Sequence, residues 1–277
     1  MTYLKQNVGG ILKEDNVSIG IDLENISTTL NGLIITHLTP KTLTLLKQEL
    51  NIPIYLTQDL LLLLQKTARF NFILLAKQDW QVLPYNIWTK VDCFKVQAFK
   101  SDDNLFSAMA LLIRTKTDFV GYCGRFCLQG EHKKAVNKWK KAFLDTQVSQ
   151  LIFEPLLLKA NEKLTSTKDL ANSFTSLLKN SSTNITANFF AWNPKQLLNY
   201  QKIATKLGWQ IVWLKNYAQL LKAIYPFEEF LTAPTNANFI QQTNDKADFL
   251  DLDWQSAIPK LTAQQIEEFH SYFFKLN

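Results

Sequence analysis

The stretch Gly32-Leu-Ile-Ile-Thr-His-Leu-Thr-Pro-Lys-Thr42 carries the decisive information about the fold of this chain. Residues 33–36 are apolar or β-branched and indicate a buried strand that ends at His37. From Pro40 to Leu50, apolar residues recur at helical spacing, and proline suits the first turn of a helix. Pro53 ends that pattern. The stretch therefore predicts a strand, a loop that begins with His37, and a helix.

Together with Asn51-Ile-Pro-Ile-Tyr55, this stretch resembles the first metal-binding loop of metallo-β-lactamase-fold nucleases, above all ribonuclease J and its β-CASP relatives. In that family a strand leads to the pattern T-H-x-H-x-D-H, and the following helix leads to N-I-P-I-Y. The resemblance implies that His37 stands at the first ligand position. Thr39, Lys41 and Thr42 stand where the family has its later His, Asp and His ligands. A lysine ammonium repels a cation instead of binding it.

Later segments resemble the family in the same order along the chain. Phe99-Lys-Ser-Asp-Asp-Asn-Leu-Phe-Ser-Ala108 is similar to T-x-H-S-I-P-D-S, which places Asp103 at a ligand histidine. Phe119-Val-Gly-Tyr-Cys-Gly-Arg-Phe126 is similar to V-x-T-G-D-F, which places Arg125 where the family has its metal-bridging aspartate. Residues 184–194 resemble the opening of the β-CASP domain. The likeness covers roughly residues 15 to 225, and we expect no counterpart of the segment with which longer relatives return to the lactamase domain.

The resemblance and the alternation of apolar segments imply an α/β (α+β layered) fold. We expect a degenerate metallo-β-lactamase-like αββα core at residues 1–155, followed by a reduced β-CASP-like α/β portion at residues 156–231. Residues 232–253 are rich in Asn, Thr, Gln and Asp and have no apolar stripe. Residues 232–277 are therefore predicted to form a polar linker and a C-terminal helix at 262–276. Further strands are predicted at 70–76 and 91–99.

Composition favours a soluble protein of the cytoplasm. Of the 277 residues, 47% are hydrophobic, which suffices for a sizeable core, and no run approaches the roughly 18 apolar residues of a membrane span. The N-terminus lacks the apolar stretch of a signal peptide. Because no run is long enough to span a membrane, we expect no membrane partner. The three cysteines, Cys93, Cys123 and Cys127, fit neither a disulfide framework nor a zinc site, so we expect them to be packing residues.

If the family fold is retained, one pocket gathers the residues at the former ligand positions, with Glu154 at its edge: His37, Thr39, Lys41, Thr42, Asp103 and Arg125. Two cations replace two carboxylates, and one unit pair at about 4 Å is worth roughly 4 kcal/mol at an effective dielectric near 20. We therefore expect no metal, no cofactor and no catalytic residues, and an ion pair of Asp103 with Arg125 or Lys41. Two simpler interpretations of His37 stay open: a hydrogen-bonded loop residue, or a loose single-cation site with Asp102 and Asp103.

Net charge is +6, and basic residues concentrate in the helix predicted at 131–144. Lys134, Lys138 and Lys141 share one face at helical spacing, Lys133 and Lys140 flank it, and Trp139 is close by. Such a face could hold single-stranded RNA through phosphate contacts and stacking. The alternative is a solvated helix face with Trp139 turned inward.

Two classes of function compete. The first is a non-catalytic ribonuclease J-like protein, kept as an RNA-associated binding or assembly module, as a homodimer or as the partner of an active ribonuclease J-like protein. The second is a metal-dependent ribonuclease or hydrolase of the metallo-β-lactamase superfamily with an altered site, against which the lost ligands argue. A nucleotide-binding α/β domain unrelated to nucleases would leave the ordered matches unexplained. The sequence favours the first class.

Overall fold

The computed structural model of the chain describes residues 2–5, 9–102, 106–128, 132–154, 156–157, 167–235, 238–251 and 260–273. The chain forms two compact units. Unit 1 comprises residues 1–62, 75–164 and 258–277, and unit 2 comprises residues 63–74 and 165–257. This division differs from the expected boundaries because unit 2 takes in a short segment from the first half of the chain, and because the C-terminal residues belong to unit 1.

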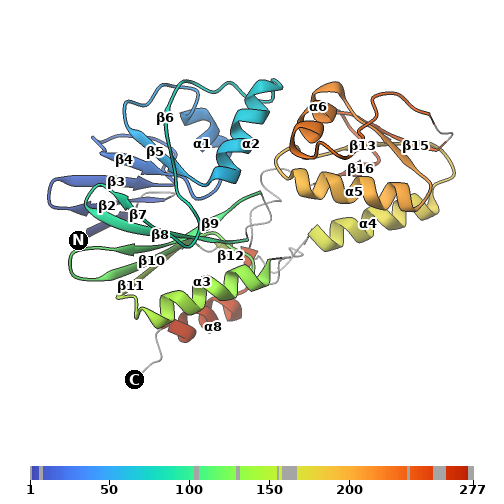
Figure 1. Cartoon of the computed structure of the whole chain (residues 1–277). Helices are drawn as coiled ribbons and strands as arrows, with labels where there is room; N and C mark the ends of the chain where they lie inside the picture. The colour runs from blue at the N-terminus through green and yellow to red at the C-terminus, as the bar shows by residue number, and fades with distance from the viewer. Residues whose placement is uncertain are drawn as a thin grey trace. The chain divides into compact units, whose positions relative to one another are not determined.

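Unit 1 contains two sheets that face each other (Figure 1). The six-stranded sheet follows chain order: β1 (Thr2–Lys5), β2 (Gly10–Glu14), β3 (Val17–Ile21), β4 (Gly32–Ile34), β5 (Pro53–Leu56) and β6 (Asp79–Val82). Its first two pairings are antiparallel and the remaining ones parallel. The second sheet has the order β11 (Gln150–Phe153), β10 (Phe119–Gly124), β9 (Met109–Arg114), β8 (Phe94–Lys100) and β7 (Trp88–Val91). Only β10 and β11 pair in parallel there.

Strand β9 shows why the second sheet is buried on both faces. Met109, Leu111 and Ile113 belong to the core between the two sheets, whereas Ala110 and Leu112 belong to a second core on the outer face. Successive side chains of a strand point to opposite faces, so a continuous apolar run of this kind requires cover on both sides.

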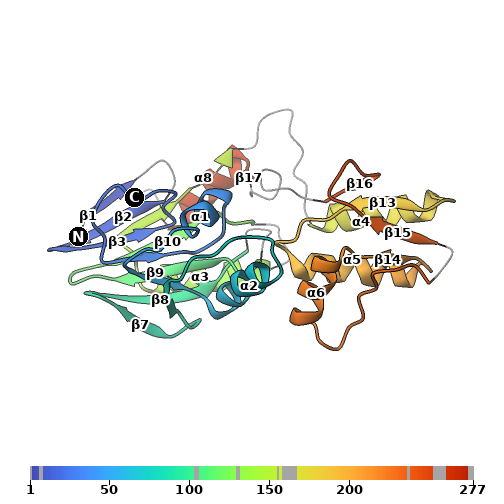
Figure 2. The ribbon, with the colours of Figure 1, turned by 90° about the horizontal axis from the view of Figure 1, so that it is seen from above.

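Helices supply that cover. Helix α3 (Lys133–Asp145) and helix α8 (Ala263–Phe273) pack on the outer face of the five-stranded sheet through Trp139, Phe143 and Phe269. Helix α1 (Pro40–Leu45) and the beginning of helix α2 (Gln58–Arg69) lie on the outer side of the six-stranded sheet (Figures 1 and 2). The order of layers in unit 1 is therefore α/β/β/α, and the predicted mixed α/β class is confirmed.

The C-terminal segment corrects one expectation. Strand β17 (Lys260–Leu261) pairs in parallel with β12 (Leu156–Leu157), and α8 follows it. Leu261 and Phe269 are both buried in the outer core of unit 1. The chain thus returns to its first unit, although the sequence led us to expect no such return. The apolar residues of this segment, at positions 261, 266, 269 and 273, explain why it packs against α3.

Unit 2 is built on a four-stranded parallel sheet. Its order is β14 (Gln210–Val212), β15 (Phe239–Gln242), β13 (Ile185–Asn188) and β16 (Phe249–Leu250). Helices α4 (Thr167–Asn180), α5 (Pro194–Lys206) and α6 (Lys215–Ile224) accompany it. The prediction of a polar linker at 232–253 was wrong for β15 and β16, whose strands are only four and two residues long. Ile240 and Phe249 suffice to anchor them in the core.

Two smaller predictions differ from the structure, one wholly and one in part, for identifiable reasons. Residues 70–76 form no strand, because Asn71 has a φ of +62° and Phe70 and Phe72 pack into the core of unit 2. The strand predicted at 91–99 is confirmed from Phe94 onward by β8, and its start is wrong because the chain turns between β7 and β8 at Asp92, which has a φ of +54°. Among the described residues, none of the helices combines the length and apolar character needed to cross a bilayer.

Candidate functional site

The loop after β4 joins a buried polar cluster at one end of the two sheets of unit 1. Asp22 follows β3 directly, and its carboxylate accepts hydrogen bonds from the Thr36 backbone N–H at 2.7 Å and from the Thr36 hydroxyl. The Tyr122 hydroxyl donates to the same carboxylate at 2.8 Å, across the gap between the sheets. The Nδ1 of His37 lies 3.3 Å from Asp22 Oδ2 and 3.1 Å from Thr36 Oγ1. Asp22, Thr36, His37 and Tyr122 are all buried.

These contacts keep the buried carboxylate charged. Burial alone would raise the pKa of Asp22, but the His37 imidazole and the hydrogen bonds from His37 and Thr36 outweigh it, and the pKa lies below its ordinary value. Burial, followed by the charge of Asp22, raises the pKa of Tyr122 well above its usual range, so its hydroxyl stays a donor. Asp22 thereby fixes the orientation of the His37 ring through Nδ1.

Thr39 and Thr42 serve the helix that follows. Thr39 is the N-cap residue of α1, and its hydroxyl accepts a hydrogen bond from the Thr42 N–H at 3.0 Å. The two hydroxyl oxygens lie 2.9 Å apart, and both residues are buried. A cap of this kind satisfies an N–H that a helix start otherwise leaves without a partner.

Lys41 points to the surface. Its side chain is 69% exposed, and its Nζ lies 2.5 Å from Glu24 Oε2. Lys41 is therefore paired with Glu24. The expected ion pair of Asp103 with Arg125 or Lys41 stays a prediction, because Asp103 lies outside the described residues.

Arg125 and Glu154 stand at the ends of β10 and β11, beside the Asp22 cluster. Glu154 accepts a hydrogen bond from the Gly9 N–H at 2.6 Å and donates its own N–H to the Gly124 carbonyl at 2.9 Å. Burial raises the pKa of Glu154, the charge of Asp22 adds to this, and Arg125 and His37 oppose it. Arg125 is half-buried, and its Nε has no hydrogen-bond acceptor within the described chain.

The structure thus brings together only some of the residues that the resemblance aligns with metal ligands. His37 and Arg125 lie close to Glu154, whereas Thr39 and Thr42 form a helix cap and Lys41 faces solvent. No group of three or more His, Cys, Asp or Glu side chains is arranged to hold a metal ion in the part of the chain that the structure describes. Asp22 already accepts three hydrogen bonds, and Arg125 adds a positive charge. These residues do not fit a dinuclear metal centre.

Sequence reasoning missed Asp22, Tyr122 and the Gly9 N–H. The signal for Asp22 was present, because it is a carboxylate directly after the buried strand 17–21, at the same sheet edge as His37. Tyr122 lay hidden in an apolar strand, where an aromatic ring with a hydroxyl reads as a packing residue. Gly9 has a φ of +69°, and its contact with Glu154 joins residues 145 positions apart, which no local pattern reveals.

The basic helix presents fewer groups than its sequence suggested. Lys133, Lys134, Lys138 and Lys141 are exposed, but Trp139 is fully buried. Its ring packs against Phe126 and Phe143 with centroids 5.2 Å away in each case. Base stacking on Trp139 is excluded, and the alternative that turns this residue inward is correct.

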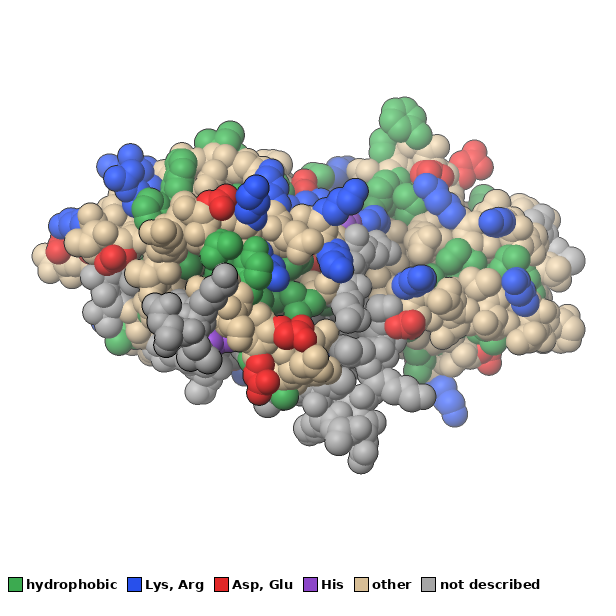
Figure 3. Space-filling model, turned by 90° about the horizontal axis from the view of Figure 1, so that it is seen from below, with side chains coloured by type: hydrophobic (Ala, Val, Ile, Leu, Met, Phe, Trp, Pro, Cys, Tyr) green, Lys and Arg blue, Asp and Glu red, His purple; other side chains and the backbone are tan. Residues whose placement is uncertain are grey.

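Lys140 also has a structural partner. Its Nζ lies 4.3 Å from the ring centroid of Tyr272 and 5.7 Å from that of Phe269, both in α8. Partial burial, assisted by the charge of Lys133, lowers the pKa of Lys140. From below, Lys and Arg side chains lie spread over the surface with hydrophobic and acidic side chains between them (Figure 3). Because Trp139 is buried and Lys140 contacts two aromatic rings, the candidate basic face consists of the exposed residues Lys133, Lys134, Lys138 and Lys141.

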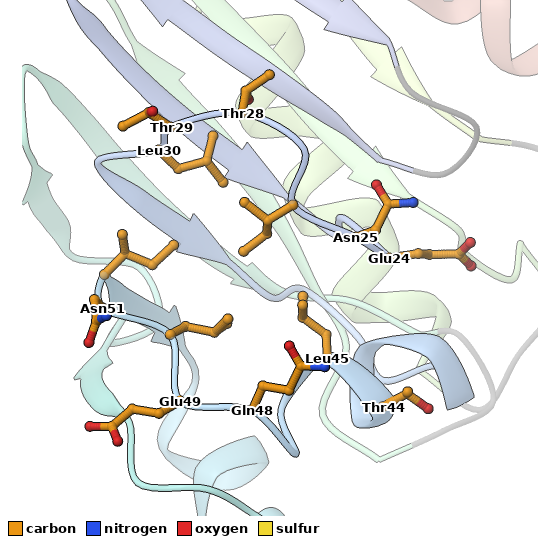
Figure 4. Close-up of a pocket in the computed structure, with 13 residues that line it drawn as sticks. Glu24, Asn25, Thr28, Thr29, Leu30, Thr44, Leu45, Gln48, Glu49 and Asn51 are labelled. Atoms are coloured by element: carbon orange, nitrogen blue, oxygen red, sulfur yellow. The ribbon is translucent and has the colours of Figure 1, made fainter.

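A separate hollow of about 650 Å³ lies in unit 1 between the loop after β3 and the segment after α1 (Figure 4). Its lining includes the carboxylates of Glu24 and Glu49 and the amides of Asn25, Gln48 and Asn51. Threonine hydroxyls and aliphatic side chains complete it, and none of the described lining residues is basic or aromatic. This hollow offers neither a cation for a phosphate nor a ring for a base.

The sequence matches no known protein family and no curated protein. Among solved structures, a protein of unknown function from Enterococcus faecalis V583 superimposes with a TM-score of 0.64 at 15% identity, over 88% of this chain and 77% of that one. At this identity the likeness concerns the fold alone. Zn(2+)-bound PqqB from Methylobacterium extorquens gives a TM-score of 0.40 at 12% identity, over 55% of this chain and 60% of that one, and supports no conclusion about this chain.

Proposed function

We propose that the chain is a non-catalytic protein of ribonuclease J-like descent, in which the positions of a former dinuclear metal site have become part of the scaffold. One observation supports this above all. In the loop after β4, His37 is held by Asp22, Thr39 caps α1 together with Thr42, and Lys41 pairs with Glu24 at the surface. Because these side chains make contacts with other parts of unit 1, they are not arranged around a cation.

Elemental analysis tests the loss of the metal site. The full chain, soaked in zinc and in manganese and then desalted, should hold neither ion in stoichiometric amount. It should also leave a 5′-labelled single-stranded RNA intact. One or two retained ions together with RNA turnover would overturn the proposal and favour an altered metal-dependent ribonuclease.

As its binding function, we propose association with single-stranded RNA through the phosphates. Support comes from the four exposed lysines of α3, which lie on one short helix in a chain of net charge +6. Phosphate contacts of this kind release counterions, so affinity should fall as salt rises. The logarithm of the association constant should fall with the logarithm of the salt concentration, with a slope of about −0.7 per phosphate contact for a single strand. Because Trp139 is buried, little preference for base identity is expected.

A charge-matched pair of variants separates a site from a general effect of net charge. In the first variant, Lys133, Lys134, Lys138 and Lys141 are replaced by Gln. In the control, four exposed lysines of unit 2 are replaced by Gln: Lys168, Lys179, Lys206 and Lys215. Only the first variant should lose affinity and salt dependence in a filter-binding assay. Equal losses in both variants would contradict a site on α3.

A further inference from the structure

The loop that follows α6 exposes one large apolar side chain completely. Phe227 is 99% exposed, more than any other large apolar residue in the described chain, and Pro226 beside it is exposed as well. A scattered apolar residue on a surface needs no explanation. Phe227 differs because the backbone around it is firmly held.

Several hydrogen bonds fix the loop along its length. The Tyr225 N–H donates to the Leu221 carbonyl at 2.7 Å, and the Glu228 N–H donates to the Tyr225 carbonyl at 3.1 Å. The Lys222 ammonium donates to the Glu228 carbonyl at 2.9 Å. Phe227 therefore sits at the apex of a closed turn.

The far end of the loop is tied to the core of unit 2. The Gln201 side-chain amide donates to the Glu229 carbonyl at 2.5 Å. The backbone N–H of Trp213 donates to the Leu231 carbonyl at 2.8 Å. Phe230 packs against the core, with its ring 6.3 Å from that of Trp213. An apolar side chain on a pre-ordered loop loses little conformational entropy on binding, which is the property of an interface anchor.

Charges of both signs surround Phe227. Lys202 and Lys222 lie beside the loop, Glu228 and Glu229 follow Phe227 in sequence, and Lys202 Nζ lies 3.5 Å from Glu228 Oε1. A phosphate backbone or an anionic membrane would be met by cations alone. A patch that mixes both signs around an apolar centre is complementary to itself, as a two-fold interface requires, because the same patch must meet its own copy.

We propose that the loop 225–231 is an interface between two copies of this chain, related by a two-fold axis, with Phe227 at its centre. This contact lies within unit 2 and does not depend on the proposed loss of the metal site or on RNA binding. Burial of Phe227 would remove its ring from water, and Glu229 of each copy would meet a lysine of the other.

Sedimentation equilibrium of the full chain over a range of concentrations tests the proposal. The unmodified chain should form dimers, and Phe227→Ala should raise the dimer dissociation constant about tenfold or more, as expected for an interface anchor. The control is Leu74→Ala, also in unit 2, whose side chain is 77% exposed. Circular dichroism should not change in Phe227→Ala, nor should the melting temperature at concentrations where both chains are monomeric, because the side chain makes no core contact. A monomeric unmodified chain, or an unweakened dimer of Phe227→Ala, would overturn the proposal.

A charge reversal tests whether the patch meets itself. Lys202→Glu makes the patch more acidic and Glu229→Lys makes it more basic, so each variant alone should dimerise more weakly than the unmodified chain at low salt. An equimolar mixture should regain the dimer, since the acidic patch of one variant then faces the basic patch of the other. A mixture that associates no better than its components would contradict a two-fold contact at this loop.

Discussion

The carboxylate of Asp22 holds three different segments together at the end of unit 1. It accepts hydrogen bonds from Thr36 after β4 and from Tyr122 in β10, and it lies beside the His37 imidazole. In a buried position, donors that lose such a charged acceptor cannot turn to water instead. The stability of this end of the sandwich therefore depends on the charge of one side chain.

We predict that Asp22→Asn destabilises the protein by about 3 kcal/mol, because it removes the charge opposite His37 and turns an acceptor into a donor facing the Thr36 and Tyr122 hydroxyls. The measurement is the free energy of unfolding in urea. Asp15→Asn is the matched control: Asp15 and Asp22 have φ angles of +52° and +50°, which asparagine readily adopts. Asp15 pairs with Lys116 at the surface, so its loss should cost far less than the loss of Asp22. Equal effects of the two changes would show that Asp22 has no special role.

Glu154 should respond to pH in the opposite sense to Asp22. Its pKa is raised mainly by burial, so the neutral form is favoured in the folded state. The stability that this shift contributes is fully present below the ordinary pKa of 4.5 and is lost as the pH rises through the raised value. Asp22 has a lowered pKa, so its contribution is present above the ordinary value and is lost as the pH falls.

We predict that Glu154→Gln gains stability relative to the unmodified chain as the pH rises from 4.5 toward neutral. The glutamine keeps an oxygen for the Gly9 N–H but has no charge to bury. Unfolding free energies of both chains, measured across this range, give the difference directly. A difference that stays constant with pH, or that moves in the other direction, would mean that the Gly9 hydrogen bond, Arg125 and His37 balance or outweigh the cost of burial.

At the scale of elements, local patterns located most helices and the central strands. Helix α3 spans 133–145 and helix α8 spans 263–273, close to the helices predicted at 131–144 and 262–276. Helix α1 ends at Leu45, five residues before the predicted end. The short strands β15 and β16 were not predicted, because a strand of four or two residues has too few apolar positions to form a pattern. Such strands form because they pair with strands that are distant in sequence.

The candidate site was predictable only where a side chain acts locally. The sequence placed His37 at a strand end, and its neighbourhood follows from the strand register. It could not reveal that Lys41 would pair with Glu24, 17 residues earlier in the chain. Thr39 directly before Pro40 is a local signal for a helix cap, but the resemblance placed Thr39 at a ligand position instead. Whether a threonine serves as a ligand, a cap or a surface residue depends on where the backbone turns, and residue type leaves that open.

At the scale of the molecule, the return of the C-terminal segment completes the core of unit 1. Phe269 is 2% exposed and lies 4.8 Å from Phe126 and 6.0 Å from Trp139, ring centroid to ring centroid. Without α8, the apolar face of α3 and the outer face of the five-stranded sheet would be partly open to water. Residues 261–273 therefore contribute to the same core as the strands near the middle of the chain.

We predict that Phe269→Ala destabilises unit 1 by about 3–5 kcal/mol through the cavity and the lost apolar burial, and leaves unit 2 unaffected. Phe174→Ala is the counterpart, because Phe174 is fully buried in unit 2, 4.9 Å from the Tyr200 ring. Native-state hydrogen exchange resolves the two units: Phe269→Ala should accelerate exchange in β9 and β10, and Phe174→Ala in β13 and β14. If Phe269→Ala left β9 and β10 as protected as before, α8 would not be part of the folded core. If either variant accelerated hydrogen exchange equally in β9 and β10 of unit 1 and in β13 and β14 of unit 2, the two units would unfold as one. Segments whose local stabilities change together form a single cooperative unit.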